Sequence, residues 1–449
     1  MFNKILVANR GEIAIRVMRA AKELGIKTVA VYSDADKASP HVQYADEAFP
    51  IGPAPAQLSY LHIPNIINAA IQTGAEAIHP GYGFLSENHH FAAICETWGI
   101  VFIGPPAQAI EHMGIKAEAR QMMAQAGVPV IPGTEGTISD LEEARAIAET
   151  IGYPMLVKAS FGGGGRGIRI VENADELGDA IERASREAKS AFGQGDVYLE
   201  KYLKRPRHIE IQVLADQLGH TIALGERESS LQRRRQKVLE EAPSVAVTPE
   251  LRQKMSEAAI KAAEAVGYTS AGTLEFLLDE DGKNFYFMEM NTRVQVEHAC
   301  TEMVTGIDIV KEQIRVAAGL PLSITQDQVA MNGWSIECRI NAEDPSKQFR
   351  PSPGTVTLWQ EPGGPGVRVD AGASTGYEVQ SFYDSLLAKV VCWGRTREEA
   401  MERMRRALDE FKIEGVKTTL ELHRNLLTDP DFQKGAIHTN FLAERMEGA

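Results

Sequence analysis

Cysteine is scarce in this chain: four cysteines are spread over 449 residues, and none forms a C-x-x-C pair. This usage argues against a disulfide framework and a structural zinc site, and it suits a reducing cytosol. Long apolar runs are also missing, since no stretch approaches the roughly 20 residues of a membrane-spanning helix. The N-terminus, MFNKILVANRGEIAIRV, has a short apolar run followed by charges, unlike a signal peptide. We therefore expect a soluble, cytoplasmic protein with no membrane partner.

Basic residues are fewer than acidic residues in this chain. The chain has 47 Lys and Arg against 61 Asp and Glu, a formal net charge of −14. Such an acidic balance disfavours nucleic acid as a partner, although a local basic cluster can still bind a small anion. Hydrophobic residues make up 44% and charged residues 24%, which is typical of globular proteins. The length is sufficient for about three domains.

The first hundred residues alternate strand and helix patterns. Residues 5–8 form a short apolar run, residues 12–24 carry apolar side chains at helical spacing, and residues 28–32 predict the next strand. This βαβ unit predicts a doubly wound parallel sheet over residues 1–113. The charged face of its helix is predicted to be a solvated stripe with i,i+4 ion pairs. That stripe consists of Glu12, Arg16, Arg19 and Glu23.

Two further regions follow, over residues 114–333 and 334–449. The first has strand patterns at 155–159, 167–171 and 208–214, a helical stretch at 174–191, and a hairpin pattern between 272 and 291. In the second, P-S-P-G and E-P-G-G-P-G break the chain into short strands, which predicts an antiparallel sheet. A helix is then expected from Thr396, with Glu399 at capping-box spacing.

The run E-M-N-T-R-V-Q-V-E-H at 289–298 is the strongest chemical signal. If it is an extended strand, alternate side chains share a face. That face would carry Glu289, Asn291, Arg293, Gln295 and Glu297. Glu275, on the first strand of the hairpin, would add a carboxylate, and such oxygen ligands suit Mg²⁺. A solvated polar strand face is the alternative, but five polar residues in series favour a site.

Two segments predict anion binding. Residues 156–170, L-V-K-A-S-F-G-G-G-G-R-G-I-R-I, place a glycine run between strands, with Lys158 and Arg166 supplying charge. A flexible linker is about equally expected from glycine alone, but the flanking strands favour a mobile phosphate lid. The segment L-Q-R-R-R-Q-K-V clusters Arg233, Arg234, Arg235 and Lys237, which is either a solvated basic patch or compensation for a polyphosphate.

Two shorter strands present alternating polar side chains. R-H-I-E-I-Q-V puts His208, Glu210 and Gln212 on one face, and a lone histidine there is more often structural than catalytic. W-S-I-E-C-R-I-N does the same with Glu337, Arg339 and Asn341. From spacing alone, Arg339 is expected to be an ion-pair residue.

Together these motifs resemble those of the ATP-grasp biotin carboxylases, nearly end to end. The resemblance adds I-L-V-A-N-R-G-E-I-A near the N-terminus, H-P-G-Y-G-F-L-S-E-N at 79–88 and E-C-R-I-N-A-E-D at 337–344. It implies an α/β (α+β) fold with a Rossmann-like N-terminal domain and a central ATP-grasp domain. It further implies a mobile lid at about residues 131–204 and a C-terminal domain built on an antiparallel sheet.

The resemblance also implies roles for individual residues. Those expected to bind ATP are Lys116, Lys158, Gly164, Gly165, Glu200, Lys201, Tyr202, Leu203, His208, Gln232 and Arg235. Those expected to hold two Mg²⁺ or Mn²⁺ ions are Glu275, Glu289 and Asn291. Those expected to bind bicarbonate are Lys237, Arg293, Gln295 and Val296. Glu297 would act as the base, with Arg293, Lys237 and Arg339 also catalytic, and Tyr82 and Arg339 would contact biotin. Arg19 and Glu23 would lie in a homodimer interface.

The implied reaction is carboxylation of biotin by ATP and bicarbonate through carboxyphosphate. The sequence has no M-K-M-type biotinyl-lysine site and no length for a carboxyltransferase, so we expect biotin on a carrier protein and, as a further partner, a carboxyltransferase subunit. Acetyl-CoA is the expected final acceptor, which would place the chain in fatty acid biosynthesis; another acyl-CoA or a 2-oxoacid remains open. The alternatives are another ATP-grasp ligase and a silent nucleotide-binding protein. Phe161 and Arg235 depart from the glycine and histidine expected in the family.

Overall fold

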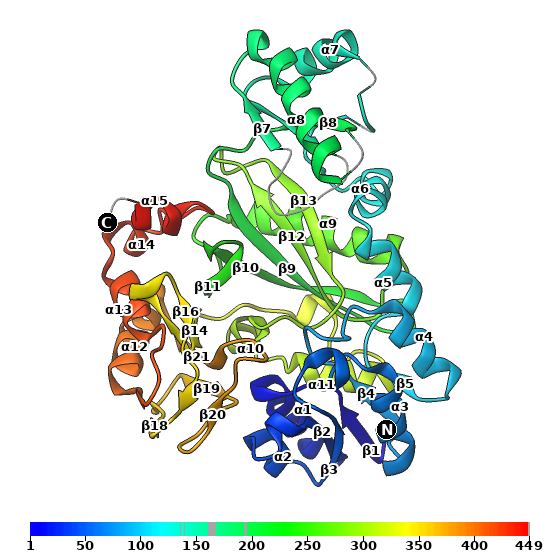
Figure 1. The fold of residues 1–449 in the computed structure, drawn as a ribbon, viewed down its shortest axis with the longest axis vertical. Helices are drawn as coiled ribbons and strands as arrows, with labels where there is room; N and C mark the ends of the chain where they lie inside the picture. Colours follow the sequence, from blue (N-terminus) through cyan, green and yellow to red (C-terminus); the bar gives the residue numbers. More distant parts are fainter. Residues whose placement is uncertain (135, 139, 160–167, 193–194, 448–449) are drawn as a thin grey trace.

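The computed structural model describes residues 1–449 except 135, 139, 160–167, 193–194 and 448–449. The chain forms a parallel α/β unit, a large antiparallel sheet with helices around it, and a small unit at the top of Figure 1. The predicted mixed α/β fold class, with parallel and antiparallel sheets in separate parts of the chain, is confirmed.

The N-terminal unit is a five-stranded parallel sheet in the order β3-β2-β1-β4-β5. Its strands are β1 (Lys4–Val7), β2 (Lys27–Ser33), β3 (Glu47–Gly52), β4 (Ala77–His79) and β5 (Val101–Phe102). Its helices are α1 (Gly11–Glu23), α2 (Pro40–Tyr44), α3 (Ile63–Thr73) and α4 (His89–Thr97), followed by α5 (Ala107–Gly114). This is the doubly wound arrangement that the βαβ pattern predicts.

An eight-stranded antiparallel sheet forms the body, in the order β13-β12-β9-β10-β11-β14-β21-β19. Its strands are β9 (Arg207–Ala215), β10 (Thr221–Arg233), β11 (Gln236–Ala242), β12 (Ser270–Leu278), β13 (Phe285–Asn291), β14 (Trp334–Asn341), β19 (Val367–Ala371) and β21 (Leu386–Gly394). The pairing of β11 with β14 joins the predicted central and C-terminal regions in one sheet. Side chains from both regions can therefore share one sheet face.

The small unit pairs three antiparallel strands in the order β7-β6-β8, covered by two helices. These elements are β6 (Met155–Ala159), β7 (Ile168–Val171), β8 (Val197–Lys201), α7 (Leu141–Ile151) and α8 (Leu177–Phe192). The unit buries its own apolar cluster, which includes Ala144, Met155, Val157, Leu177 and Leu199. A separate core allows this unit to behave as a body of its own.

Helices and short strands complete the fold. The helices are α6 (Lys116–Gln125), α9 (Pro249–Ala265), α10 (His298–Thr305), α11 (Ile309–Ala317), α12 (Arg397–Glu410), α13 (Leu420–Thr428), α14 (Pro430–Gln433) and α15 (Phe441–Glu447). The short strands are β15 (Glu343–Asp344), β16 (Arg350–Pro351), β17 (Gly354–Thr355), β18 (Leu358–Gln360), β20 (Glu378–Val379) and β22 (Lys412–Glu414). At the start of α12, the Thr396 hydroxyl accepts from the Glu399 N–H, as its sequence predicts. None of the helices in the described ranges is long and apolar enough to cross a membrane.

The charged stripe of α1 differs from the prediction. Glu12 and Arg16 are buried, 3% and 6% exposed, because α1 packs between the parallel sheet and α11. Arg16 pairs with Glu302 at 2.8 Å and with Asp308 at 2.7 Å. Only the far part of the stripe reaches solvent. The prediction of a fully solvated face is therefore wrong for its first half.

Candidate active site

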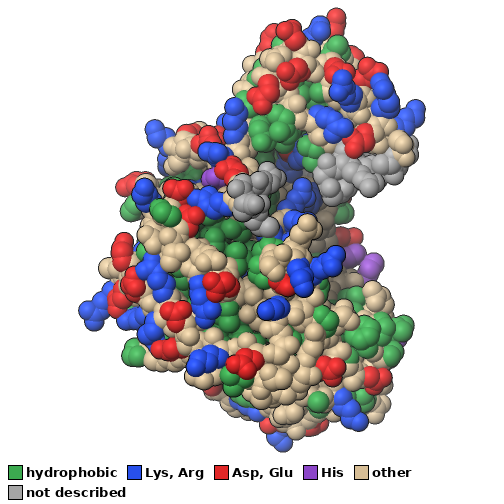
Figure 2. Space-filling model, turned by 60° about the vertical axis from the view of Figure 1, so that its left-hand side comes forward, with side chains coloured by type: hydrophobic (Ala, Val, Ile, Leu, Met, Phe, Trp, Pro, Cys, Tyr) green, Lys and Arg blue, Asp and Glu red, His purple; other side chains and the backbone are tan. Residues whose placement is uncertain are grey.

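A cavity of about 2190 Å³ opens where the parts of the chain meet, lined by residues from the N-terminal unit, the small unit and the large sheet. The recess between the small unit and the body is visible in Figure 2, with Lys and Arg side chains around it. Its walls include Tyr82, Lys116, Lys158, Glu275 and Arg339. Residues predicted from separate motifs thus line one cleft.

The β12–β13 hairpin brings three predicted metal ligands together. Glu275 lies directly opposite Glu289 in the pairing register, and Asn291 lies opposite Thr273. The Asn291 amide donates to Glu275 Oε1 at 2.8 Å. Glu289 is more open, with its Oε2 3.3 Å from Lys116 Nζ. Carboxylate and amide oxygens at the cleft fit a hard divalent cation such as Mg²⁺.

The predicted extended strand ends early. Strand β13 stops at Asn291, and residues 292–297 turn before α10 begins at His298. The predicted alternation is therefore wrong beyond Asn291. The turn nevertheless keeps the polar side chains at the cleft: Gln295 donates to Glu275 Oε1 at 2.8 Å, and Arg293 donates to Asn291 Oδ1 at 2.9 Å. Arg293 also pairs with Glu87 at 2.9 Å.

Lys237 lies at the centre of the carboxylates. Its ammonium group contacts Glu210, Glu275 at 2.8 Å and Glu297 at 2.7 Å. Burial alone would lower the pKa of Lys237, but the carboxylates of Glu210, Glu297 and Glu275 raise it well above its ordinary value. Lys237 is therefore a fixed positive charge at this end of the cleft.

Glu297 lies between two cations. Its Oε1 accepts from Lys237 and its Oε2 from Arg339 at 2.8 Å. Burial opposes ionisation, but Lys237 and Arg339 together lower the pKa of Glu297 well below its usual range. Arg339 also donates to Glu240 at 2.7 Å, and burial raises the pKa of Glu240 to about 7. Arg339 thus bridges two carboxylates, Glu297 with a lowered pKa and Glu240 with a raised pKa.

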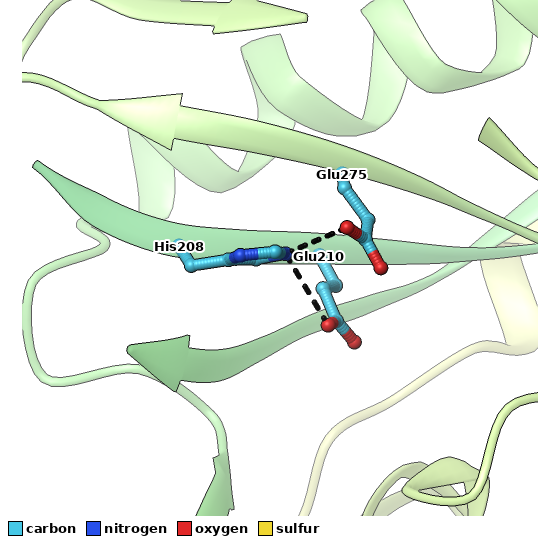
Figure 3. Close-up of side chains that lie close together, drawn as sticks. All are labelled: His208, Glu210 and Glu275. Atoms are coloured by element: carbon cyan, nitrogen blue, oxygen red, sulfur yellow. Dashed lines mark ion pairs between the residues drawn. The ribbon is translucent and has the colours of Figure 1, made fainter. Parts of the chain in front are cut away.

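Figure 3 shows the side chains of His208, Glu210 and Glu275 pointing toward one another, and His208 and Glu275 line the cavity. His208 Nε2 lies 3.0 Å from Glu275 Oε2 and 3.5 Å from Glu210 Oε1, and Gln232 contacts the other ring nitrogen at 2.8 Å. Burial lowers the pKa of His208, but Glu275 outweighs this and the pKa is raised. Ligand atoms of the three residues lie within 4.8 Å of one another, which gives Glu275 additional buried neighbours able to ligate a cation.

Among the described nucleotide residues predicted from the sequence, Lys158, Glu200 and Lys201 lie on strands of the small unit. Lys158 on β6 pairs with Glu200 on β8 at 2.7 Å, and Arg120 pairs with the same carboxylate at 2.8 Å. Lys201 pairs with Asp279 at 2.8 Å across to the β12–β13 turn, and Leu203 is buried. The N–H groups of Lys201 and Tyr202 donate to the carbonyls of Pro132 and Pro154. Gly164, Gly165, Phe161 and Arg166 lie outside the described residues.

The basic cluster divides at the tip of the β10–β11 hairpin. Arg233 pairs with Glu343 at 3.6 Å and stacks over Phe349, whereas Arg234 and Arg235 are exposed at the tip with positive φ. Arg235 still borders the cavity. Of the four basic side chains, Lys237 is the one that contacts Glu210, Glu275 and Glu297. A uniform basic patch is therefore not formed.

Tyr82, which is predicted to contact biotin, lies at the cavity, whereas the residues predicted for the dimer interface lie on the exposed part of α1. Tyr82 lines the cavity and donates its hydroxyl to Glu12, while burial raises its pKa well above the ordinary value. Arg19 and Glu23 lie further along α1, with side chains 46% and 63% exposed. Glu23 pairs with Lys311. The two parts of α1 thus lie in different surroundings.

Glu210, Glu240 and Lys389 lie at the site, but the sequence assigns no role to them. The alternation along β9 does place Glu210 on the face of His208, but it gives no reason to expect a contact with Lys237. Lys389 is fully buried, pairs with Glu12 at 3.4 Å and donates to the Val296 carbonyl, which fixes the backbone beside Glu297. Glu240 lies on β11 with Lys237 and meets Arg339 through the pairing of β11 with β14, and Lys389 lies on β21. These contacts join strands distant in sequence, so no local pattern identifies them.

Family models match almost the whole chain in three parts. Residues 1–110 match the biotin carboxylase N-terminal domain, residues 116–325 the carbamoyl-phosphate synthase L chain ATP binding domain, and residues 337–444 the biotin carboxylase C-terminal domain. The resemblance inferred from the sequence motifs is confirmed.

Relatives of known identity match over almost their full length. Biotin carboxylase 1 of Bacillus subtilis is 56% identical over 442 residues, covering 98% of each chain. The biotin carboxylase subunit of a pyruvate carboxylase, a solved structure, has a TM-score of 0.92 at 54% identity, covering 100% of this chain and 99% of that one. The biotin carboxylase domain of the 2-oxoglutarate carboxylase of Hydrogenobacter thermophilus, solved as a dimer with MgADP, ADP and bicarbonate, has a TM-score of 0.88 at 55% identity, covering 99% and 98% of the two chains.

Proposed function

The chain belongs to the biotin carboxylase family, and we propose how its residues divide the work of carboxylating biotin with ATP and bicarbonate. The observation that carries the assignment is the position of Glu297, buried between Lys237 and Arg339 beside the carboxylates of the β12–β13 hairpin. A base, two cations and a metal-binding set in one cleft are the groups that bicarbonate activation needs.

The nucleotide would lie between the small unit and the hairpin. Lys158, Lys116, His208 and Gln232 line that part of the cavity, and Arg235 borders it. The backbone of residues 200–203 would contact the adenine. The glycines Gly164 and Gly165 would cover the phosphates, as the family resemblance implies. The enzyme uses Mg²⁺, which Glu275, Glu289 and Asn291 would hold and which would supply positive charge against the phosphates.

Bicarbonate would bind at Arg293, Gln295, Lys237 and the backbone of Val296. Lys237 and Arg339 now contact Glu297; an arriving anion competes for both cations and so weakens their hold on this carboxylate. The pKa of Glu297 then rises toward its usual range, which makes it a better base for the bicarbonate proton. The bicarbonate oxygen attacks the γ-phosphorus of ATP, ADP leaves, and carboxyphosphate forms.

Biotin would enter beside Tyr82 and Arg339. Carboxyphosphate breaks down to CO₂ and phosphate, and the phosphate removes the proton from the ureido nitrogen of biotin. The Arg339 guanidinium would stabilise the resulting enolate-like anion, which then attacks CO₂. Closure of the small unit over these labile species would exclude water from them.

Biotin would arrive on a separate carrier protein, and a carboxyltransferase subunit would take the carboxyl group onward. We propose acetyl-CoA as the final acceptor, in fatty acid biosynthesis in the cytoplasm. A 2-oxoacid is the second candidate, because two relatives of similar identity belong to pyruvate and 2-oxoglutarate carboxylases. A homodimer is supported by the dimer of the Hydrogenobacter relative. Arg19 and Glu23 would lie in its interface, as the family resemblance implies.

The test is phosphate release from ATP with Mg²⁺ and bicarbonate, with and without free biotin. We expect biotin to stimulate release in the wild type, and this stimulation to disappear in Arg339→Met while bicarbonate-dependent release persists. Release that ignores biotin in the wild type would point instead to another ATP-grasp ligase. Stimulation that survives in Arg339→Met would remove Arg339 from its proposed place beside biotin.

A further inference from the structure

Arg227, in the middle of β10, is a fully buried charge that none of the sequence motifs explains. Its side chain has 0% exposure and lies behind the carboxylates of the cleft, outside the cavity lining. The surrounding sequence, G-E-R-E-S-S, has no pattern that marks a site. A buried arginine needs its donors satisfied, because an unpaired buried charge is costly.

All five N–H donors of Arg227 have an acceptor, which is the full capacity of a guanidinium. Nε donates to Glu210 at 3.1 Å. Nη1 donates to Gln212 Oε1 at 2.8 Å and to Thr301 at 2.9 Å. Nη2 donates to Thr273 at 3.2 Å and to Gln295 Oε1 at 2.6 Å. The acceptors come from β9, β12, α10 and the turn after β13. Arg227 therefore joins four separate segments behind the cleft.

The contact with Gln295 decides how that amide faces the cleft. Because Arg227 only donates, the atom of Gln295 that it meets has to be the carbonyl oxygen. The amide nitrogen then points the other way, where it donates to Glu275 Oε1 at 2.8 Å. The other oxygen of the carboxylate that Arg227 holds, Glu210 Oε1, accepts from Lys237. Arg227 thus orients two groups that face the substrate side without touching that side itself.

We propose that Arg227 is a positioning residue for bicarbonate, fixing the Gln295 amide with its N–H groups toward the cleft. The inference rests on the proposed function, in which Gln295 binds bicarbonate. Lysine cannot substitute, because its ammonium has three donors on a flexible stem and cannot reach five acceptors in one plane. Substituting Arg227 removes the donor that holds the Gln295 oxygen away from the cleft, which weakens the orientation of the amide although Glu275 still accepts from its nitrogen. An amide oxygen turned toward the cleft would repel the anion.

Arg397 offers a matched control. It is also a buried arginine, 7% exposed, and it donates to Glu241 and to the carbonyls of Phe432 and Gln433. None of these three partners is a predicted site residue. Arg397→Lys therefore makes the same chemical change in a comparable buried network, away from the cleft.

The experiment measures KM for bicarbonate and for ATP in the wild type, Arg227→Lys and Arg397→Lys, from phosphate release with saturating biotin. In Arg227→Lys we expect KM for bicarbonate to rise about 10- to 100-fold, the scale of losing a supporting contact, with KM for ATP changed less than about 3-fold. Arg397→Lys should leave both constants near wild type. Equal rises in both constants for Arg227→Lys would mean a merely structural role and would overturn the proposal.

A double substitution tests the route through Gln295. If Arg227 acts by orienting this amide, Arg227→Lys should add less than about 3-fold to KM for bicarbonate in a Gln295→Ala background. A full additional rise there would overturn the route. Should Arg227→Lys fail to fold, Thr301→Val removes one of its acceptors: a selective rise in KM for bicarbonate supports the proposal, and no change contradicts it. Wild-type release without bicarbonate dependence would instead mean that the proposed function fails.

Discussion

The two ends of the cleft hold their charges in different ways. At the end of the cleft where we propose that the nucleotide binds (the nucleotide end), the Lys116 side chain is 85% exposed and its partner Glu289 is 36% exposed. At the end where we propose that bicarbonate binds (the bicarbonate end), the Lys237 side chain is 13% exposed and that of Glu297 only 2%. One lysine therefore pairs directly with one carboxylate at an exposed position, whereas the other is shared by three carboxylates within the protein.

Burial explains the difference. A charge removed from water has to be paired within the protein, whereas an exposed ion pair gains little from its partner. The bicarbonate end is thus assembled in advance, and a substrate anion there has to take over contacts that the protein already makes. At the nucleotide end, the polyphosphate can bring its own charge to side chains that are still hydrated. Substitutions should therefore have larger effects at the bicarbonate end.

The largest effect is expected for Glu297→Gln, which removes the proposed base and keeps its size, although the amide oxygen can accept from only one of Lys237 and Arg339. Biotin-dependent phosphate release should fall by about 10²- to 10⁴-fold, the contribution typical of a positioned general base. The rate of release at saturating substrates measures this. Lys116→Met, at the open end, serves as the comparison and should mainly raise KM for ATP. A variant Glu297→Gln with more than a tenth of wild-type activity would contradict the assignment of the base.

The next largest effect concerns stability rather than rate. Lys237→Met leaves Glu210, Glu275 and Glu297 without their shared cation, and breaking a buried ion pair in this way costs about 3 to 5 kcal/mol. Lys116→Met removes an exposed pair, worth about 0 to 1 kcal/mol. Denaturant unfolding of both variants without nucleotide measures the difference. Equal losses would mean that the two ends do not differ as described.

Much of this arrangement could be predicted from sequence, because the signals were local. Alternation along β9 placed His208 and Glu210 on one face, and the hairpin pattern placed Glu275 on the strand that pairs with the strand of Glu289. The end of β13 at Asn291 could not be predicted, since the alternating polar residues continue through the turn. Periodicity reports which side chains share surroundings, and a turn can gather them as well as a strand.

The supporting charges could not be predicted because their partners are remote in sequence. Glu240 and Lys389 reach the site through pairing between strands distant in sequence. Arg227 lies on the strand that follows β9, but it contacts Thr273, Gln295 and Thr301 from later parts of the chain. The burial of Arg16 has the same origin, since its partners Glu302 and Asp308 lie almost 300 residues away. Spacing identifies the groups that face a substrate, whereas tertiary packing alone reveals those that hold them in place.

A pH experiment tests whether the cations at the bicarbonate end keep the buried carboxylate of Glu240 ionised. Burial raises the pKa of Glu240 to about 7, above the value of about 4.3 expected in the unfolded chain. The folded state then binds the proton more tightly, so Glu240 makes stability fall as pH rises from about 4.3 to 7. Glu240→Gln lacks this effect, so its unfolding free energy relative to wild type should improve by about 1 to 3 kcal/mol between pH 5 and pH 8. Glu297, whose pKa is lowered, titrates below this window. A relative stability that does not change with pH would show that Arg339 keeps Glu240 fully ionised.

The smallest effect on the folded protomer is expected at the surface. Glu23→Lys reverses a charge whose side chain is 63% exposed and sets it against Lys311. Exposed pairs contribute about 0 to 1 kcal/mol, so the free energy of unfolding of the protomer, measured with denaturant, should change by no more than that.

If Glu23 lies in a dimer interface, however, the same reversal places like charges where two copies meet and weakens association. Sedimentation at micromolar concentration should then report monomers for Glu23→Lys and dimers for the wild type. A Glu23→Lys protein that stays dimeric would place the interface elsewhere, and a large loss of protomer stability would mean that the exposed end of α1 carries as much of the fold as its buried beginning.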